Sequence, residues 1–150
     1  MKNLIKLILI FVLTSGCAYA QDNYSFKVYL KDQMIDVFLD GVLLKKIPCS
    51  TGMKPGSTPT GKFKTYLREK KNSWVEPDGT ELFYHYITRI SDKNGVAFHS
   101  MLEGDHSFVD EGKKLFEARK PSSIGCIRLK KEDAKWIYDL PLGVAVEIID

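Results

Sequence analysis

Cys126 is the residue of this chain best suited to covalent chemistry, because of the residues on either side of it. It follows Gly125 in the run Pro121–Leu129, and a glycine before a nucleophile lets the backbone turn sharply. Amide protons exposed by such a turn can form an oxyanion hole for acyl transfer. Arg128 adds a fixed positive charge that can hold a carboxylate and favour a thiolate. The pattern indicates that Cys126 is a nucleophile and that Gly125 belongs to its catalytic turn.

A nucleophilic thiol needs a base, because a cysteine with a pKa of about 8.5 is mostly protonated at neutral pH. The candidates are His85, His99 and His106. His99 directly follows the apolar stretch Val96–Phe98, and the end of a strand positions a base better than a loop. We therefore predict His99 as the base, keep His106 as its rival, and interpret His85 as structural.

Cys49 gives the sequence an alternative reading, in which it forms a disulfide with Cys126. An exported protein with two cysteines commonly pairs them. Such a bond would silence the nucleophile, and it requires Cα atoms within about 7 Å of each other. The separation of Cys49 and Cys126 in the fold decides between the two readings.

Residues 1–20 have the features of a secretory signal peptide. Lys2 and Lys6 precede the apolar run Leu7–Leu13, and Ala18-Tyr19-Ala20 provides a cleavage site. This apolar run is far shorter than the roughly 20 residues of a membrane-spanning helix. We expect a mature domain of residues 21–150 in the periplasm or cell wall. The alternative is a lipoprotein anchored through Cys17, because Leu13–Cys17 loosely resembles a lipoprotein box.

The remaining composition is that of one globular domain. The 150 residues are 44% hydrophobic and 27% charged, which is ordinary for a folded chain. Lys2 and Lys6 are the charged side chains of residues 1–20, so their removal lowers the net charge from +3 to +1. Such a chain does not favour nucleic-acid binding, which usually requires a strongly basic surface. We expect a monomer.

Most of the mature chain alternates apolar and polar residues with a period of two, which is typical of strands. Asp40-Gly41 is a strong signal for a two-residue hairpin turn. Long connections at 50–60 and 100–123 are candidates for substrate contacts, because long loops in small domains are usually functional. We expect strands near 24–30, 35–39, 42–49, 61–68, 82–90, 96–99 and 144–149, a helix at 131–140 and a helical turn near 111–118. The sum predicts a mostly β sandwich with one or two short helices.

Four motifs together resemble the L,D-transpeptidase catalytic domain, of the YkuD type, over residues 24–150. The family has a His-Gly or His-Ser pair followed by Ser-His-Gly-Cys-hydrophobic-Arg, and this chain has Phe98-His99-Ser100 and Ser123-Ile124-Gly125-Cys126-Ile127-Arg128. The early signature is matched by Ser50-Thr51-Gly52 and Thr58-Pro59-Thr60-Gly61-Lys62-Phe63, and the usual ending by residues 133–146.

The resemblance implies a function. In this family the upstream histidine, here His99, deprotonates the cysteine with support from Ser100. The thiolate attacks the carbonyl between the third and fourth residues of a peptidoglycan stem peptide. D-Ala leaves, an amine of a neighbouring stem takes the acyl group, and the product is a cross-link between third residues. No cofactor or metal is implied, and we assign substrate contacts to Arg128, Ser123, Tyr84 and Tyr86.

One position departs from the family pattern. Ile124 stands where a histidine usually precedes Gly-Cys. The nucleophile and base survive this change, so Ile124 bears on substrate preference and rate. Two further hypotheses remain open: an L,D-carboxypeptidase in which water is the acceptor, and a non-catalytic peptidoglycan-binding domain.

Overall fold

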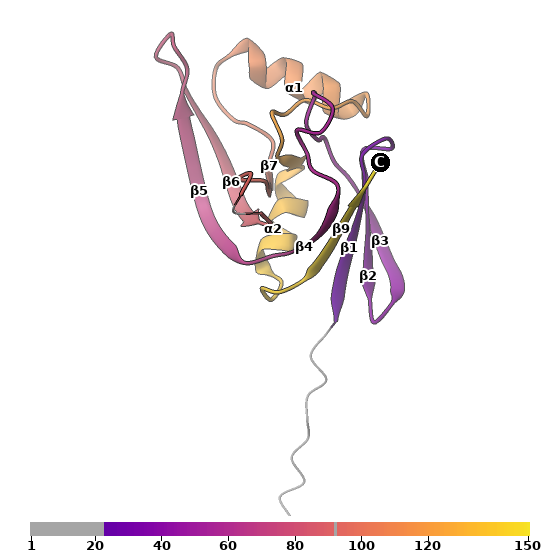
Figure 1. The fold of residues 1–150 in the computed structure, drawn as a ribbon. Coiled ribbons are helices and arrows are strands. Elements are labelled where there is room, and N and C mark those ends of the chain that lie inside the picture. Colours follow the sequence, from indigo (N-terminus) through magenta and orange to yellow (C-terminus); the bar gives the residue numbers. More distant parts are fainter. Residues whose placement is uncertain (1–22, 92) are drawn as a thin grey trace, which may run out of the picture.

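The computed structural model describes residues 23–91 and 93–150; the predicted signal peptide and Cys17 lie outside these residues. None of the helices in the described ranges is long and apolar enough to cross a membrane. In chain order the elements are β1 (Tyr24–Tyr29), β2 (Met34–Leu39), β3 (Val42–Pro48), β4 (Gly61–Lys64), β5 (Leu67–Val75), β6 (Glu81–Arg89), β7 (Ala97–Ser100), α1 (Ser107–Glu117), β8 (Ile127–Leu129), α2 (Lys131–Asp139) and β9 (Ala145–Ile149) (Figure 1).

A first sheet, sheet A, has the strand order β3-β2-β1-β9-β4. Strands β1 to β3 form an antiparallel meander, while β9 runs parallel to β1 and antiparallel to β4. The predicted turn at Asp40-Gly41 is confirmed: φ is 51° at Asp40 and 79° at Gly41. Both values lie in the left-handed region that a type I′ hairpin turn requires.

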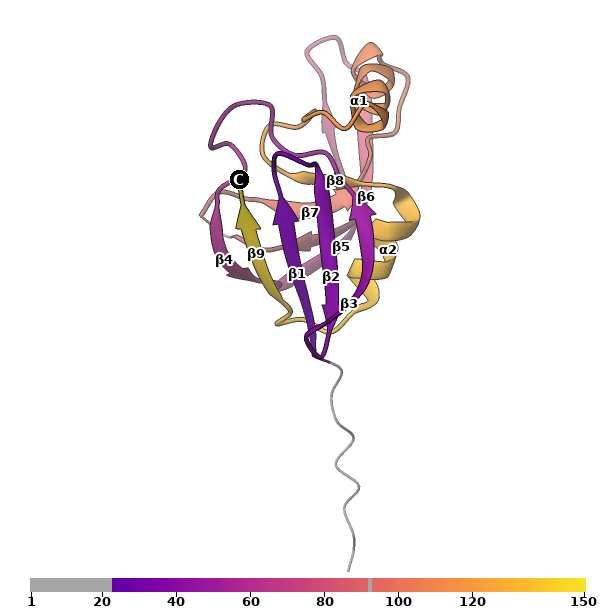
Figure 2. The ribbon, with the colours of Figure 1, turned by 90° about the vertical axis from the view of Figure 1, so that its right-hand side faces the viewer.

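A second sheet, sheet B, has the order β5-β6-β7-β8. Strands β5 and β6 form a long hairpin, and β7 and β8 pair in parallel. Figure 2 shows the steep strands of sheet A in front of sheet B, whose strands run across them. Helix α1 lies in the connection between β7 and β8, and α2 packs against β6 and β7.

The hydrophobic core lies between the two sheets and beneath α2. Phe26 of sheet A meets Phe98 of sheet B edge to face, with ring centroids 5.8 Å apart. Removing such apolar side chains from water supplies most of the driving force for folding. The buried cluster also contains Val28, Ile35, Val37, Ile47, Cys49, Ile127, Leu129, Ala134, Ile137, Val146 and Ile148. The mostly β architecture predicted from the alternating pattern is therefore confirmed.

The prediction of one strand over residues 61–68 is wrong. Gly61–Lys64 pairs with β9 of sheet A, whereas Leu67 begins β5 of sheet B. Between them Thr65 accepts the amide of Gly143 at 2.7 Å and donates its own amide to Val144 at 3.0 Å. These bonds turn the chain from one sheet to the other. The polar run that continues β5 to Val75 was not predicted, because its alternation is weak.

Helix α1 is longer than the predicted helical turn. It begins at Ser107, and the Nδ1 atom of His106 caps it by accepting the amide of Phe108 at 3.2 Å. A histidine is an uncommon N-cap, which hid the start of this helix. Helix α2 agrees with its prediction to within one residue and begins with two carboxylates in its first turn.

Candidate active site

Cys126 lies at the junction between a tight loop and the short strand β8, and hydrogen bonds within the loop fix its backbone. The hydroxyl of Ser123 donates to the carbonyl oxygen of Cys126 at 2.6 Å and accepts the amide of Gly125 at 3.0 Å. A Cβ atom at Gly125 would lie 2.8 Å from the carbonyl oxygen of Ser57. Only glycine fits there, so the residue before the nucleophile is fixed by a close approach of two backbones.

The early signature loop, residues 50–60, is hydrogen-bonded to residues 121–126, which form the nucleophile loop, and to the start of β8. The backbones of Ser50 and Arg128 exchange two hydrogen bonds, at 2.9 and 2.8 Å, and the amide of Ser123 donates to Thr51 at 3.0 Å. The Thr58 hydroxyl donates to the carbonyl oxygen of Gly125 at 2.7 Å. Two segments about 70 residues apart in sequence are thus joined by hydrogen bonds. This explains why the early signature accompanies the Cys126 motif in the sequence pattern.

His99 lies near Cys126, at the pairing of β7 with β8. In the parallel pairing of β7 with β8, His99 is the partner of Arg128, and Cys126 precedes Arg128 by two residues. His99 and Cys126 also share a neighbour, because the ring of Tyr84 packs 4.7 Å from that of His99, and the pKa of Tyr84 is raised by burial and then by the proximity of Cys126. The Nδ1 atom of His99 lies 2.6 Å from the carbonyl oxygen of Ser100, so Nδ1 carries the proton and donates it. The tautomer leaves Nε2 as the basic nitrogen.

Burial controls the charge of both groups. It lowers the pKa of His99 to about 4; the Ser100 carbonyl opposes this shift, and Arg128 and Arg89 add to it. Burial also raises the pKa of Cys126, although a backbone hydrogen bond from Ala97 and the charges of Arg128 and Arg89 lower it. The resting pair is therefore a neutral thiol and a neutral imidazole. Arg128 favours the thiolate, as predicted, but burial outweighs it.

Ser100 interacts with the histidine through its backbone. Its hydroxyl accepts the amide of His85 at 2.9 Å and donates to the carbonyl oxygen of Met101 at 2.8 Å. The side chain thus joins β6 to the end of β7, while the carbonyl oxygen orients His99. Any residue has that carbonyl, so the serine hydroxyl is not the group that contacts the imidazole.

Arg128 is only 5% exposed, and its contacts brace the nucleophile loop. Its Nη1 atom donates to the carbonyl oxygen of Ser122 at 2.7 Å. Its Nε atom is buried without a hydrogen-bond partner, and no carboxylate of the described residues lies within 4 Å of the guanidinium. An unpaired buried donor is costly, so this guanidinium retains bonding capacity for an anionic ligand.

A pocket of about 240 Å³ opens beside the guanidinium of Arg128. Its other lining residues come from the early signature loop, the β5–β6 hairpin, α1 and the nucleophile loop: Met53, Trp74, Glu76, Phe108, Ser122 and Ile124. Glu76 accepts the indole proton of Trp74 at 2.6 Å. Sequence reasoning singled out Ile124 but missed the other pocket residues, because they come from separate segments. The sequence signal is that Met53, Phe108 and Ser122 lie in connections already expected to be functional.

The two tyrosines predicted to contact substrate lie in different places. The ring of Tyr84 packs 4.7 Å from that of His99, and burial, followed by the proximity of Cys126, raises its pKa. Tyr86 has a φ of 55°, which breaks the alternation of β6, and its ring packs edge-on against Tyr138 of α2 at 5.7 Å. The structure therefore brings Tyr84 to the site but not Tyr86.

Ser123 is also placed differently from its prediction as a substrate contact. It is buried, and both its hydroxyl bonds are made within the nucleophile loop. Its neighbour Ser122 lines the pocket instead. Ser123 thus positions Cys126 and does not face the pocket.

The remaining histidines have structural contacts. His106 caps α1, and its Nε2 atom lies 3.6 Å from Asp78 at the tip of the β5–β6 hairpin. The Nε2 atom of His85 lies 3.3 Å from Glu103. Neither contact involves Cys126, so the structure favours His99 over His106 as the base. The described residues contain no cluster of three or more His, Cys, Asp or Glu side chains that could hold a metal ion.

Cys49 and Cys126 are both free thiols. Cys49 is buried in the core, and this burial raises its pKa to about 12. Because Ser50 pairs antiparallel with Arg128, Cys49 and Cys126 are offset by three residues along the pairing, which is roughly 10 Å at strand spacing. That offset exceeds what a disulfide spans, so the structure does not support the disulfide reading.

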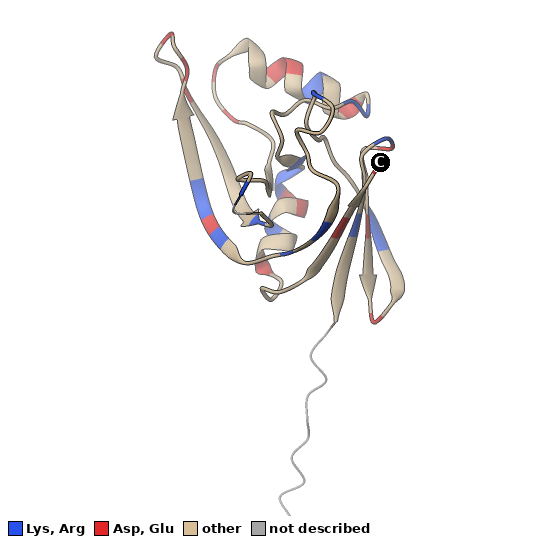
Figure 3. Ribbon diagram, viewed as in Figure 1, with Lys and Arg blue, Asp and Glu red and all other residues tan. Residues whose placement is uncertain are grey.

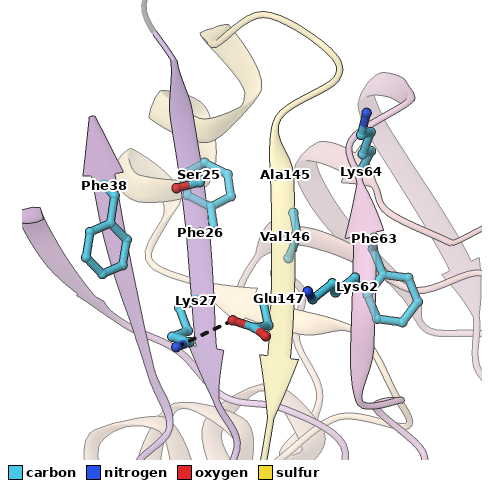
Figure 4. A pocket seen from close by; sticks show the side chains of 10 residues that line it. All are labelled: Ser25, Phe26, Lys27, Phe38, Lys62, Phe63, Lys64, Ala145, Val146 and Glu147. Atoms are coloured by element: carbon cyan, nitrogen blue, oxygen red, sulfur yellow. Dashed lines mark ion pairs between the residues drawn. The ribbon is translucent and has the colours of Figure 1, made fainter. Parts of the chain in front are cut away.

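A larger hollow, of about 440 Å³, lies on sheet A. Figure 4 shows its walls, with Phe38 on one side and Lys62 on the other, and the ion pair of Lys27 with Glu147 at 3.4 Å. Its lining includes no cysteine or histidine. The pocket beside Arg128 is the one next to the reactive pair along the chain, because its lining residues Ile124 and Arg128 lie two residues before and two residues after Cys126.

Comparison with known proteins identifies the class of this domain. A family model described as the L,D-transpeptidase catalytic domain, YkuD, matches residues 23–148, and the chain belongs to that family. The putative L,D-transpeptidase YciB of Bacillus subtilis (strain 168) is 31% identical over 88 residues, covering 57% of this chain and 43% of that protein. The chain therefore spans less than half the length of this curated relative.

Solved structures share the fold. The L,D-transpeptidase LdtMt1 in complex with imipenem has a TM-score of 0.67 at 24% identity, covering 85% of this chain and 59% of that one. An L,D-transpeptidase from Mycobacterium smegmatis has a TM-score of 0.66 at 24% identity, with coverages of 86% and 59%. The sandwich is thus of the L,D-transpeptidase catalytic type, as the four motifs predicted.

Proposed function

We propose that this protein is a peptidoglycan L,D-transpeptidase with Cys126 as nucleophile and His99 as general base. The observation that carries the proposal is the bond from Nδ1 of His99 to the carbonyl oxygen of Ser100, at 2.6 Å. It leaves Nε2 as the basic nitrogen of a histidine that shares the neighbour Tyr84 with Cys126. A cysteine and a histidine so arranged are suited to nucleophilic acyl transfer.

The reaction begins from the neutral pair. His99 takes the thiol proton as Cys126 attacks the carbonyl between the third and fourth residues of a donor stem peptide. The imidazolium then gives this proton to the departing amine of D-Ala, which leaves a thioester on Cys126. An amine of a neighbouring stem attacks the thioester, His99 takes its proton, and the thiol is restored as the new amide forms. The backbone amide of Cys126 is the donor available to the oxyanion, because the amides of Gly125 and Arg128 already donate to Ser123 and Ser50.

Ile124 is suited to a role in substrate preference. Its side chain is 83% exposed and lies at the pocket beside Arg128. An exposed isoleucine makes no hydrogen bond or proton transfer, so its contribution is apolar contact with the stem peptide. The missing histidine at this position leaves the proposed base, His99, unaffected.

The test of the proposed function is the mass profile of muropeptides after purified protein acts on sacculi. A transpeptidase produces dimers joined through third residues and releases D-Ala. Conversion of tetrapeptides to tripeptides without dimers would instead identify the L,D-carboxypeptidase, in which water takes the acyl group. An unchanged profile from folded, reduced protein would leave only the non-catalytic peptidoglycan-binding domain.

The proposed place of action follows from the substrate. Peptidoglycan lies outside the cytoplasmic membrane, and residues 1–20 have signal-peptide features. We propose export to the periplasm or cell wall as a monomer, with anchoring through a lipidated Cys17 as the alternative.

Arg128→Lys is expected to reduce turnover while leaving thiol reactivity largely intact. Lysine keeps the charge near Cys126 but loses the planar donor pair and the free Nε atom. If Arg128 anchors a stem-peptide carboxylate, kcat/KM falls, because the transition state loses about 1.5–3 kcal/mol of stabilisation. The measurements are steady-state turnover of stem peptide and the rate of alkylation by a neutral reagent.

Two outcomes would count against the anchoring role of Arg128. Unchanged turnover would reject it outright. Loss of folding, seen by circular dichroism, would instead assign the guanidinium to bracing the loop through Ser122. Ile124→Val is a matched control, since it changes an apolar side chain of the same pocket without touching a charge.

A further inference from the structure

Exposed large apolar side chains gather at two ends of the molecule. Met53, Phe108 and Ile124 line the pocket beside Arg128, and Val75 adjoins Trp74 of the same pocket. The other exposed apolar residues lie away from that pocket: Val42, Leu43, Leu44, Tyr66, Leu67 and Leu142. The first group is explained by the site, but the second has no role in it.

Strand register brings the second group to one end of sheet A. Tyr24 at the start of β1 pairs with Leu39, directly before the β2–β3 turn. Ala145 at the start of β9 pairs with Lys64 at the end of β4. The amide of Gly143 donates to Thr65 at 2.7 Å, which joins the loop of Leu142 to that of Tyr66. In Figures 1 and 2 the β2–β3 turn, the start of β1 and the start of β9 lie together at the lower end.

The β2–β3 hairpin exposes three consecutive apolar side chains, whereas a regular strand would turn alternate ones inward. Val42 is 70% exposed, and Leu43 and Leu44 follow it. The register shifts here, because Val37 pairs with Lys45 while Phe38 pairs with Leu43. Leu44 is thus the extra residue of a bulge on the edge strand of sheet A. Natural edge strands usually carry charges, so three apolar residues here indicate a contact surface.

The position of the chain's N-terminal segment indicates what this surface meets. Asn23 enters the fold at this end and accepts the amide of Asp40, in the β2–β3 turn, at 3.0 Å. Nine residues separate Asn23 from the apolar run that ends at Leu13. A chain of that length reaches at most about 35 Å. If a membrane holds the segment before residue 23, the apolar end is therefore the part of the domain nearest to it.

The charges at this end agree with a bilayer surface. The loop between α2 and β9, which contains Leu142, has no charged residue (Figure 3). Lys64 is exposed at the end of β4 and suits anionic head groups, while Asp40 in the turn suits the aqueous head-group layer. Apolar side chains on a mostly polar surface are typical of proteins that lie on a membrane.

We propose that this end of sheet A, the apolar end formed by Val42, Leu43, Leu44, Tyr66, Leu67 and Leu142, docks on the lipid bilayer beside the chain's N-terminal segment. One lipid chain gives only marginal membrane binding, so stable anchoring takes a second contact. The apolar end supplies that contact and favours retention through Cys17 over release after Ala20. The docked domain presents the pocket beside Arg128 away from the membrane. The proposal does not depend on the acyl-transfer activity.

The test uses the full-length chain and places one tryptophan at a time at one or the other end of the folded domain. Leu43→Trp and Leu142→Trp probe the apolar end, and Val75→Trp is the matched control, because Val75 is 65% exposed and ends the strand that Leu67 begins. Each chain is incorporated into vesicles of phosphatidylethanolamine and phosphatidylglycerol with brominated acyl chains. Loss of emission is measured relative to the unsubstituted chain, and circular dichroism confirms folding.

We expect the emission at positions 43 and 142 to be blue-shifted and quenched by bromine, with position 75 unchanged. Quenching at 43 or 142 that does not exceed that at 75 overturns the proposal. Emission at 43 that shifts on self-association without lipid, and is not quenched by bromine, also overturns it and assigns the surface to a second copy of the chain.

Discussion

Replacing Cys126 with alanine is expected, under the proposed function, to abolish covalent labelling by imipenem and to reduce stem-peptide conversion by about 10⁴- to 10⁶-fold, the scale of loss when a nucleophile is removed. The other thiol of the described residues, Cys49, is buried in the core. The fold should survive, because the loop of Cys126 is held by Ser123, Thr58 and Thr51 and not by the thiol. Intact-mass analysis after incubation with imipenem detects the adduct, and muropeptide analysis gives the residual rate.

Cys49→Ala is the matched control for this experiment. Cys49 is the other cysteine of the described residues, and its burial in the core raises its pKa to about 12. A buried, protonated thiol is inert, so this variant should keep the full adduct and rate. An adduct that persists in Cys126→Ala would show that Cys126 is not the nucleophile. Wild-type protein that forms no adduct would favour the peptidoglycan-binding domain.

The activity is expected to persist to lower pH than an ordinary histidine base allows. Burial lowers the pKa of His99 to about 4, so its imidazole stays neutral and able to accept a proton down to that pH. A histidine with the usual pKa of about 6.5 would already be mostly protonated at about pH 5. We therefore expect kcat/KM to stay level from neutral pH down to about pH 5 and to fall near pH 4. At alkaline pH we expect the change in kcat/KM to come from ionisation of the Cys126 thiol, whose pKa is raised by burial.

His99→Gln is expected to lower kcat/KM by about 10²- to 10⁴-fold, the usual contribution of a general base. The matched control is His106→Gln, which removes the rival base and weakens the cap of α1 without touching His99. Steady-state rates on a stem-peptide donor, with folding checked at each pH, test both statements. An acid limb near pH 6.5 would contradict the lowered pKa, and an equal loss in His106→Gln would contradict the assignment of the base.

Local patterns predicted those parts of the fold whose causes are local. Asp40-Gly41 forms its turn because two adjacent residues tolerate positive φ, and α2 begins with carboxylates at its first turn. The strand break at Thr65 depends instead on bonds to Gly143 and Val144, almost 80 residues away. A pattern read along the chain contains no information on such partners, so 61–68 was predicted as one strand.

The candidate site also has parts that local patterns predicted and parts that depend on contacts between distant residues. The spacing of Gly125, Cys126 and Arg128 pointed to the nucleophile, and the strand before His99 pointed to the base. Tyr84 and Tyr86 were both predicted to contact substrate, but Tyr86 has a positive φ and its ring packs against α2. Ser100 was predicted to support the histidine, and it is the backbone carbonyl oxygen of Ser100 that makes the contact.

The sequence by itself determined the family and the alternating strands and predicted the reactive pair, because each depends on residues close together in the chain or on ordered motifs. Only the tertiary structure decided the charge states of that pair and the shape of the pocket. The pKa of His99 is lowered by burial among several elements, and the pocket combines Trp74, Phe108 and Arg128 from separate segments. Desolvation and pocket shape arise only when distant segments pack together, so no local pattern specifies them.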